Sequence, residues 1–526
     1  MSLASTADGN GNGNGMRAKS PRSVVRAIPI PGDAASSSNG KNVPTPFEMS
    51  PVNLPSFPKK VFDVRDYGAI GDSLHDCSEG IAKAIVACAK EGGGRVLIPE
   101  GTWKTGPIHL QSNIDVHLAR GATVQFSDDP MDYLPLVFVR WGGLECYNYS
   151  PLIYARNCNN IAITGSGVIL GRGKKWWVYK KRQQKAHAQL YQMAIDGVPV
   201  DQRKFGSEEH MLRPQVIAPI NCTNVLLEDF TVGEGGPMWA VHLAYCSDVT
   251  VRRVRIIAPE GPNNDGIIVD SSRNVIVEDC DLHTADDCIA LKSGMNEEGQ
   301  RLGKPTENVI IRRIRATAGH GGITIGSDMS GGVRNVFVHD CHYDGPSAGI
   351  RFKAARGRGG VVENIYAQDI TMGRIPGDAI EMTTDFPGFV LPGGKAPTFR
   401  NIQIKNVTCQ QARTAARMIG LADTPLQNIS VENLTIACDS GLHCTSGNDI
   451  RLVNCSISPK LGPVMSLKDT QDVVIEGMSG TDVSRIFLDL HGRQTKNIRL
   501  RGEPTSHIRP TVVLGVDVPK DALVHE

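Results

Sequence analysis

A short motif recurs eleven times from Asn224 onwards, and it constrains the fold more than any other feature of the chain. Each copy begins with Asn or Asp and continues with alternating apolar and polar residues, as in NVIVEDCDL at Asn274 and NVFVHDCHY at Asn335. The copies start 21 to 37 residues apart, a spacing typical of solenoid repeats. A repeat this short cannot bury its apolar face alone, so successive coils must stack.

The coils are built of strands, because the alternation is rich in Val and Ile and is bounded by Asn, Asp and Gly. A β-sandwich also contains many short strands, but eleven copies of one motif at similar spacing are not expected from Greek-key hairpins. The sequence therefore predicts an all-β fold, a single-stranded right-handed parallel β-helix (solenoid) with an N-terminal cap that contains a short helix.

Composition divides the chain into three parts. Residues 1–58 are rich in Gly, Ser, Asn and Pro, and we expect them to be disordered. Residues 59–505 are expected to form the β-helix and its cap, in which Cys77–Gly93 indicates an amphipathic helix that ends at Gly92. Residues 506–526 are expected to be a C-terminal tail. The Lys-rich stretch Lys174–Gln189 interrupts the repeats and predicts a helical or loop excursion over a groove of the solenoid. Its charges either form a solvated face or attract an acidic ligand.

Four short clusters follow one another within about ninety residues. If Gly266, Cys288, Gly322 and Gly349 occupy equivalent positions of successive coils, strands about 4.8 Å apart bring these clusters within roughly 10 to 15 Å of one another. This is the footprint of one or two sugar rings. The clusters are PNNDG at Pro262–Gly266, ADDC at Ala285–Cys288, GHGG at Gly319–Gly322 and IRFK at Ile350–Lys353, and the side chains that would meet are those of Asn264, Asp265, Asp286, Asp287, His320, Arg351 and Lys353.

These residue types are suited to cleaving a glycosidic bond. Carboxyl groups can protonate a leaving oxygen and activate a water molecule. Three carboxylates in a small volume repel one another, so one of them is expected to stay protonated towards neutral pH. Arg351 and Lys353 lie two apart on a strand and share a face, where they can grip the carboxylate of an acidic sugar.

Each residue alone also has a purely structural explanation. Asp265 is typical of a solenoid turn, His320 of a glycine-rich loop, and Arg351 with Lys353 of a solvated strand face. The adjacent carboxylates of Asp286 and Asp287 are harder to explain this way, because no basic residue flanks them in the sequence. The joint occurrence of all four clusters in one register favours a catalytic site.

The four clusters resemble the signature segments of glycoside hydrolase family 28, the polygalacturonases, whose usual forms are NTD, DD, GHG and RIK. VRDYGAIGDS, GGGRVLIPEGTW and RGRGGVVENI add flanking matches, so that the resemblance extends from about Phe62 to beyond Asn497. Asn264 stands where the family often has Thr, and Phe352 where it often has Ile. RWGGLECYNYSP at Arg140–Pro151 is among the segments similar to bacterial exo-acting members.

The resemblance implies inverting hydrolysis of α-1,4-galacturonosyl linkages in pectate, with carboxyl groups about 6.5 to 9.5 Å apart. It implies exo action, because the long step between Asn274 and Asn308 carries an insertion that can close one end of a groove. It assigns the general acid to Asp286, the water to Asp265 and Asp287, and a tuning role to His320. We also expect Arg351, Lys353 and Asn263 to bind substrate. The aromatic residues Trp141, Tyr147, Tyr149 and Trp239 are expected either to stack on sugars, Trp239 foremost, or to belong to the core or cap.

Three alternatives remain at this stage. They are a rhamnogalacturonan or other substituted-pectin hydrolase on the same scaffold, a pectate lyase that would need Ca²⁺, and a non-catalytic glycan-binding β-helix. A pectic polysaccharide or oligogalacturonide is the expected partner of a polygalacturonase and of the first alternative. With 56 basic against 55 acidic residues, no nucleic-acid partner is expected.

Several further expectations concern what the chain lacks. No apolar run approaches transmembrane length, and no CxxC or His cluster predicts a metal or other cofactor. Cys280, Cys341 and Cys455 fall at the same position of their repeats, which predicts a ladder of buried free thiols. The family resemblance implies an extracellular or periplasmic location, but the N-terminus shows no signal-peptide core, so a cytoplasmic location is the alternative. No oligomeric state is predicted.

Overall fold

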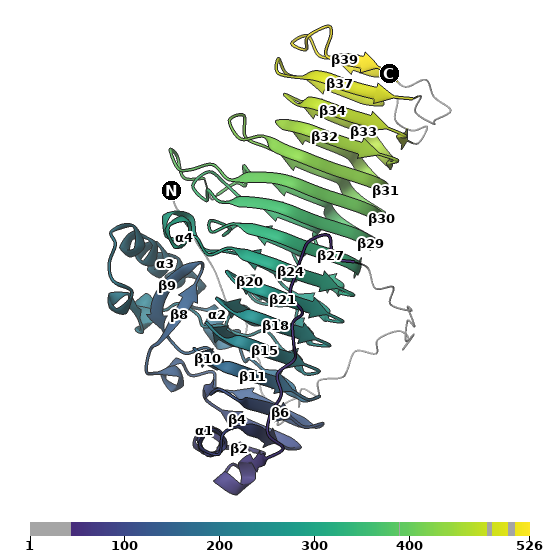
Figure 1. Ribbon diagram of the computed structural model, residues 1–526. Coiled ribbons are helices and arrows are strands. Elements are labelled where there is room, and N and C mark those ends of the chain that lie inside the picture. The colour runs from purple at the N-terminus through teal and green to yellow at the C-terminus, as the bar shows by residue number, and fades with distance from the viewer. Residues whose placement is uncertain (1–43, 389, 481–485, 503–510) are drawn as a thin grey trace, which may run out of the picture. The chain divides into compact units, whose positions relative to one another are not determined.

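The computed structural model describes residues 44–388, 390–480, 486–502 and 511–526. Residues 45–526 form one compact unit, a single-stranded right-handed parallel β-helix as the sequence predicts. Figure 1 shows the coils stacked one above another, with each strand parallel to its neighbours in the coils above and below. Side chains of Val, Ile, Leu and Cys fill the space inside the coils and form one continuous core.

Three parallel sheets form the sides of the first coils. The first sheet contains β1 (Val61–Asp63), β3 (Gly94–Ile98), β6 (Ile114–Leu118), β11 (Asn159–Thr164), β15 (Thr223–Glu228), β18 (Ser247–Arg252), β21 (Arg273–Glu278) and β24 (Thr306–Arg312). The second contains β2 (Asp72–Asp76), β4 (Gly101–Thr105), β7 (Ala122–Phe126), β12 (Val168–Leu170), β16 (Thr231–Gly233), β19 (Arg255–Ala258), β22 (Asp281–Thr284) and β25 (Arg315–Ala318). The third contains β5 (Ile108–His109), β10 (Ile153–Arg156), β14 (Ile217–Ile220), β17 (Val241–Ala244), β20 (Ile267–Asp270), β23 (Ile289–Lys292), β26 (Gly321–Gly326) and β28 (Ala348–Lys353).

In later coils the strands continue around the corners and become longer. These are β27 (Val333–Tyr343), β29 (Val361–Thr383), β30 (Thr398–Ile419), β31 (Leu426–Thr445), β32 (Gly447–Val453), β33 (Ser456–Lys468), β34 (Gln471–Glu476), β35 (Ser479–Gly480), β36 (Leu488–His491), β37 (Lys496–Arg501), β38 (Val512–Leu514) and β39 (Leu523–His525). The last two pair with β36 and β37. The segment expected to be a C-terminal tail, residues 506–526, therefore continues the stack where it is described.

The Asn or Asp that opens each repeat has a structural role. Asn274, Asn308 and Asn335 all have left-handed backbone angles, with φ of 54°, 56° and 55°, a conformation that Asn tolerates better than most residues. The side-chain amide of Asn308 donates to Asn274 Oδ1 at 3.1 Å, and that of Asn335 donates to Asn308 Oδ1 at 3.1 Å. Such a ladder turns each coil at the same place, which explains why the motif repeats.

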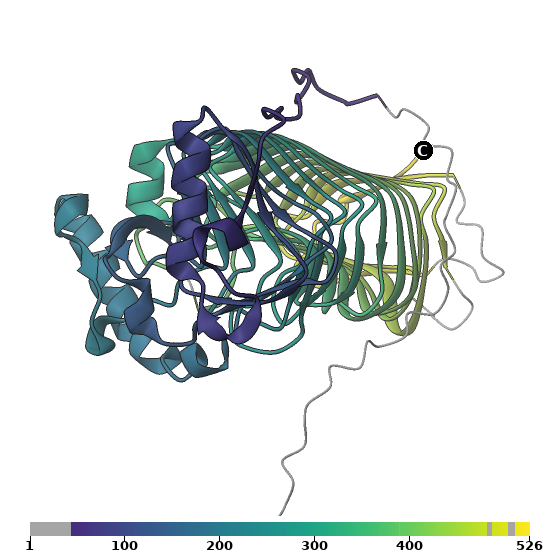
Figure 2. The ribbon, with the colours of Figure 1, turned by 90° about the horizontal axis from the view of Figure 1, so that it is seen from below.

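The N-terminal cap contains the expected helix. Helix α1 (Ser78–Lys90) lies across the first coils and buries Ile81, Ile85 and Cys88 against β1 and β3 (Figure 2). It covers the apolar end that an open stack would expose to water. A short 3₁₀ helix, η1 (Val64–Tyr67), precedes it.

The sequence predicts that residues 1–58 are disordered. Of these, residues 1–43 lie outside the described residues. Residues 44–60 form no helix or strand, but they contact the coils. The amide of Asn160 donates to Ser56 O at 2.8 Å, and the ring of Phe47 lies 6.3 Å from that of Tyr366. The described part of this segment is therefore ordered, because its apolar side chains and carbonyl groups find partners on the β-helix.

A separate group of elements covers one side of the middle coils, and we call it the side wall (Figure 1). Strands β8 (Val137–Trp141) and β9 (Leu144–Asn148) are antiparallel, and β13 (Lys204–Phe205) pairs with β9. The side wall also contains helices α2 (Lys174–Trp177) and α3 (Lys180–Ile195) and the 3₁₀ helices η2 (Pro130–Tyr133), η3 (Val200–Gln202) and η4 (Glu208–His210). A helix or a loop was expected for the Lys-rich stretch, and the structure shows two helices there. Helix α4 (Asn296–Leu302) is the insertion between two coils.

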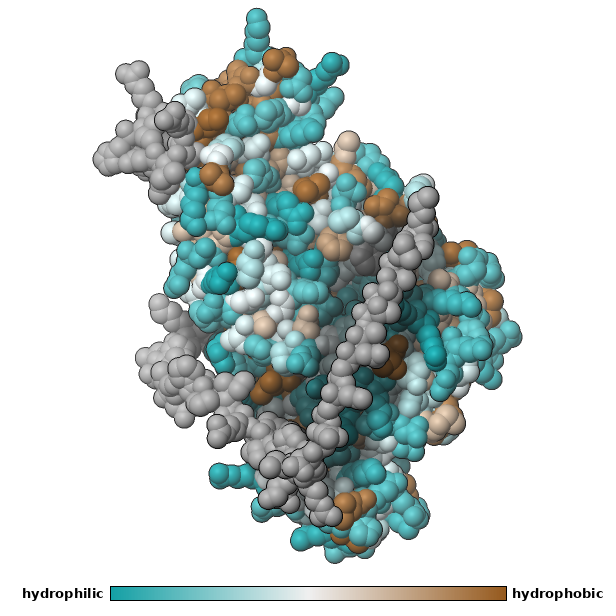
Figure 3. Space-filling view, turned by 180° about the vertical axis from the view of Figure 1, so that it is seen from behind, coloured by the Kyte–Doolittle hydropathy of each residue, from teal (hydrophilic) through white to brown (hydrophobic). Residues whose placement is uncertain are grey.

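All thirteen cysteines are buried free thiols, which confirms the predicted use of Cys280, Cys341 and Cys455 as core residues. Within the described ranges, no helix is both long and apolar enough to cross a bilayer. The face seen in Figure 3 is largely hydrophilic, and its apolar side chains are scattered among polar ones.

Candidate active site

The predicted register of the four clusters is confirmed by the strand pairing. Ile267 pairs with Ile289, Ile289 with Ile323, and Ile323 with Ile350. These isoleucines directly follow the four positions that the sequence analysis placed in one column, Gly266, Cys288, Gly322 and Gly349. The clusters therefore lie on four consecutive coils: the first three stand at the beginnings of β20, β23 and β26, and the fourth forms the second part of β28.

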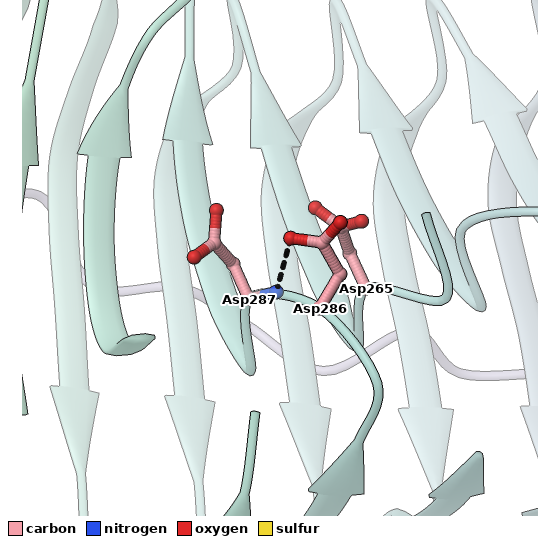
Figure 4. Close-up of side chains that lie close together, drawn as sticks. All are labelled: Asp265, Asp286 and Asp287. Atoms are coloured by element: carbon pink, nitrogen blue, oxygen red, sulfur yellow. Dashed lines mark hydrogen bonds between the residues drawn. The ribbon is translucent and has the colours of Figure 1, made fainter. Parts of the chain in front are cut away.

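Three carboxylates meet at this place (Figure 4). Asp265, Asp286 and Asp287 each offer an oxygen that lies within 4.8 Å of the others. Asp265 and Asp287 are buried, whereas the side chain of Asp286 is 19% exposed. These oxygen–oxygen distances are shorter than the separation of about 6.5 to 9.5 Å between carboxyl groups that the family resemblance implies. The reason is the fold, because Asp286 and Asp287 are neighbours in sequence and Asp265 lies on the adjacent coil.

Asp287 is held ionised by cations. Lys353 Nζ donates to its Oδ2 at 2.8 Å, and Arg351 Nη1 lies 3.5 Å from its Oδ1, which also accepts from Thr324 Oγ1 at 2.9 Å. Burial by itself would raise the pKa of Asp287, but attraction to Lys353, Arg351 and Lys292 outweighs it and lowers the pKa to about 2. The basic pair of the IRFK cluster thus faces the carboxylate of Asp287 as well as the cavity.

Asp265 behaves in the opposite way. Burial raises the pKa of Asp265 well above its ordinary value, and repulsion from Asp286 raises it further, while Lys292 opposes the increase. Asp286 Oδ1 accepts from the backbone amide of Asp287 at 3.0 Å and contacts His320 Nδ1 at 2.9 Å. That hydrogen bond raises the pKa of His320 despite partial burial of the ring. The acids therefore differ in charge, because nearby cations favour ionised Asp287 while burial favours protonated Asp265.

The acids open into a cavity of about 570 Å³. All the residues that the sequence analysis named for catalysis or substrate binding contribute to its lining: Asp265, Asp286, Asp287, His320, Arg351, Lys353, Asn263 and Trp239. The cavity is the right size for a sugar or two, and its wall mixes carboxylates with several cations.

Two of the expected substrate-binding residues are already in contact with neighbouring side chains. Trp239 is 5% exposed, its ring packs edge-on against His242, and Lys292 Nζ lies 5.5 Å from its ring centre. Little of the indole face is free for stacking on a sugar. Asn263 Oδ1 already accepts hydrogen bonds from Lys180 and Arg213.

Other lining residues were not identified from the sequence. Lys292 is buried at the end of β23, donates to Gly326 O at 3.2 Å and lies 3.8 Å from Asp328. Arg358 is buried beside the same carboxylate at 3.1 Å. A lone lysine in a strand gives no signal by itself. Because Ile289 and Leu291 fill the core, however, the alternation of β23 places Lys292 on the outer face that carries the cavity, and this could have been predicted.

The side wall contributes the rest of the lining. Trp141 and Gly142 come from the β8–β9 hairpin, and Lys180, Gln183, Gln184 and His187 come from α3. The wall is anchored by buried charges. Arg140 Nε lies 3.0 Å from Asp270 Oδ2 on β20, and both side chains are buried. The buried carboxylate of Glu298 on α4 accepts from the Glu145 amide at 3.0 Å and from Arg203 Nη1 at 2.5 Å.

The three grouped carboxylates are also the kind of oxygen set that can bind a metal ion. Their charge is already balanced in another way, because Lys353 and Arg351 face Asp287 and burial favours protonated Asp265. The arrangement is therefore better suited to proton transfer than to holding a divalent cation.

The sequence of residues 88–456 matches the family model described as glycosyl hydrolases family 28. The chain is 29% identical over 385 residues to the protein named "Probable polygalacturonase" of Vitis vinifera, covering 70% of this chain and 73% of that protein. It is 26% identical over 386 residues to an exo-poly-alpha-D-galacturonosidase of Dickeya chrysanthemi, covering 67% of this chain and 62% of that protein.

Solved structures agree with these sequence matches. A hyperthermoactive exopolygalacturonase from Thermotoga maritima superposes with a TM-score of 0.70 at 34% identity, covering 81% of this chain and 94% of that chain. The family 28 exopolygalacturonase of Yersinia enterocolitica superposes with a TM-score of 0.62 at 22% identity, covering 88% and 79%. At that identity, the second match supports the fold alone.

Proposed function

The chain belongs to glycosyl hydrolases family 28, and we propose that it is a polygalacturonase that hydrolyses α-1,4-galacturonosyl linkages and releases galacturonic acid from a chain end. The observation that carries this proposal is the meeting of Asp265, Asp286 and Asp287 in a cavity that Arg351 and Lys353 also line. The carboxyl groups supply the acid and base of glycoside hydrolysis, and the cations suit a uronate.

The proposed general acid is Asp286. It is the most exposed of the three carboxyl groups and so the best placed to reach the glycosidic oxygen. Its proton comes from Asp265, whose protonated form is favoured by burial before substrate binds. Transfer of that proton to Asp286 leaves Asp265 ionised. His320 positions Asp286 through the contact at Oδ1.

The proposed base is the ionised pair Asp287 and Asp265. A water molecule held by these carboxylates attacks the anomeric carbon while the bond to the leaving oxygen breaks. The leaving oxygen takes the proton of Asp286, and one of the basic carboxylates takes a proton of the attacking water. The cluster thus regains the single proton with which it started.

The side wall supports exo action. Residues of α3 and of the β8–β9 hairpin line the same cavity as the acids, and α4 is anchored to the hairpin through Glu298. A groove for internal cleavage must be open at both ends, whereas a wall on one side suits a chain end. We also propose that the enzyme acts outside the cytoplasm, because its substrate is a polymer of the plant cell wall.

Product analysis tests the proposal. The protein is incubated with polygalacturonate in the presence of EDTA, and the products are separated by anion-exchange chromatography, with the Asp286→Asn variant as a control for contaminating activity. We expect saturated galacturonic acid from the first time point. Unsaturated ends would indicate a lyase, a ladder of mid-sized oligomers would refute exo action, and release from rhamnogalacturonan alone would move the enzyme to that substrate. An absence of products from either polymer would refute hydrolysis.

A further inference from the structure

A buried cation lies behind Asn263 without an acidic partner. The guanidinium of Arg213 is fully buried, and it donates only to neutral oxygens. Nε donates to Gln183 Oε1 at 2.7 Å, Nη1 to the carbonyls of Pro237 at 2.7 Å and Pro262 at 2.8 Å, and Nη2 to Asn263 Oδ1 at 2.9 Å. Among the described residues, no carboxylate forms an ion pair with it.

A second cation reaches the same oxygen from the side wall. Lys180, the first residue of α3, donates from Nζ to Asn263 Oδ1 and lines the cavity. It too makes no ion pair with a carboxylate in the described part of the chain. Buried charges in proteins are ordinarily paired, and two cations that converge on one neutral oxygen are unusual. Burial lowers the pKa of Arg213 to about 10, and burial together with Arg213 lowers the pKa of Lys180.

These cations and the basic pair of β28 stand on opposite sides of the acids. Asn263 precedes β20, whereas Arg351 and Lys353 belong to β28, three strand steps further along the stack. Three steps of about 4.8 Å amount to about 14 Å. Asp286 and Asp287, on the coil of β23, lie between the two groups, and Asp265 shares the coil of Asn263. A substrate cleaved there would have one sugar near each group of cations.

We propose that Lys180 and Asn263, with Arg213 behind them, form a second carboxylate subsite that binds the uronate on the other side of the scissile bond from the uronate bound by Arg351 and Lys353. This inference rests on the proposed function and extends it from one recognised uronate to two. Lys180 contacts the substrate, and Arg213 is a positioning residue that orients Asn263 and supplies positive potential. The side wall thus carries a specificity determinant that the four motif clusters do not contain.

Two disaccharides, each with a single carboxylate, separate the two subsites. They are galacturonosyl-α-1,4-galactose and galactosyl-α-1,4-galacturonate, and their binding is measured by calorimetry to the Asp286→Asn protein, with digalacturonate as reference. Adding Lys180→Gln should weaken binding of one disaccharide roughly tenfold more than the other, the effect of losing one charge-assisted hydrogen bond. Adding Lys353→Gln should show the reverse preference. Lys180→Arg keeps the charge and should restore most of the discrimination.

Lys181→Gln is the matched control, because Lys181 is exposed on the same helix and the charge change is the same. It should leave both affinities unaltered. The inference is overturned if Lys180→Gln weakens both disaccharides equally, weakens neither, or acts on the same one as Lys353→Gln. Melting temperatures of the variants identify a folding defect, which would affect all three ligands alike. If digalacturonate itself fails to bind, the proposed function fails, and the inference falls with it.

Discussion

Replacing Lys353 with methionine should move the acidic limb of the pH–activity profile to higher pH. The carboxylate of Asp287 must be ionised to activate water, and Lys353 Nζ is the cation closest to it, at 2.8 Å. Methionine has a similar length and no charge, so the change removes the attraction with little loss of volume. Once the ammonium group is gone, a larger share of Asp287 is protonated at a given acidic pH.

The size of the effect follows from the pKa of Asp287. The pKa lies at about 2 against an ordinary value of 3.8, a difference worth about 2 kcal/mol at 1.36 kcal/mol per unit. This is stability present above pH 3.8 and lost as the pH falls towards 2. Loss of a charge-assisted bond of about 1.5 to 3 kcal/mol should raise the pKa by about one to two units. Arg351 and Lys292 retain the remainder of the attraction.

The assay is kcat/KM on digalacturonate as a function of pH, which reports the ionisation of the free enzyme. Lys460→Met is the control, because Lys460 forms a Lys–Asp pair of similar length, 2.9 Å, with Asp439 at an exposed position. Lys353→Met also weakens uronate binding, so each profile is normalised to its maximum before the limbs are compared. Superimposable acidic limbs in wild type and Lys353→Met would refute the reasoning that this lysine keeps Asp287 ionised.

Three further predictions concern the acid, the metal question and the side wall. Asp286→Asn should lower kcat by about 10²- to 10⁴-fold, measured as reducing ends, while the calorimetric affinity for digalacturonate changes little; near-normal turnover would show the acid to be misassigned. Dialysis against EDTA should leave the rate unaltered, because Lys353 and Arg351 already balance Asp287, and a loss restored by Ca²⁺ would contradict this. Arg140→Met should destabilise the protein by about 3 to 5 kcal/mol in denaturant unfolding, because it removes the arginine that is paired with the buried carboxylate of Asp270. Adding Asp270→Asn should recover part of the lost stability.

The repeat and the site register could be predicted because both depend on local sequence. A strand has a period of two residues and a coil has a fixed turn, so aligning Gly266 with Cys288 also aligned Asp265 with Asp287. The asparagine ladder adds a second constraint, because each Asn must turn the chain at the same place. These features are repeated many times, and any single irregular copy does not obscure them.

The side wall could not be predicted because its contacts join distant parts of the chain. Glu145 meets Glu298, which lies 153 residues away, and nothing in either segment indicates the other. For the same reason, the Lys-rich excursion could be predicted from its composition, but not the contact between Lys180 of α3 and Asn263. Trp239 was expected to bind sugar, yet its ring is largely covered by neighbours that come from other coils, including Lys292.

The anomeric form of the first product tests the central claim most directly. Proton NMR during the first minutes of polygalacturonate hydrolysis distinguishes the two anomers before they interconvert, because the newly formed anomeric centres outnumber the reducing ends already present in the polymer. If Asp286 protonates the leaving oxygen while Asp265 and Asp287 direct water to the opposite face, newly released galacturonic acid from the cleaved α-linkage should appear first as the β-anomer. Initial appearance of the α-anomer would show that one of these closely grouped carboxylates attacks the sugar itself, and would contradict the account.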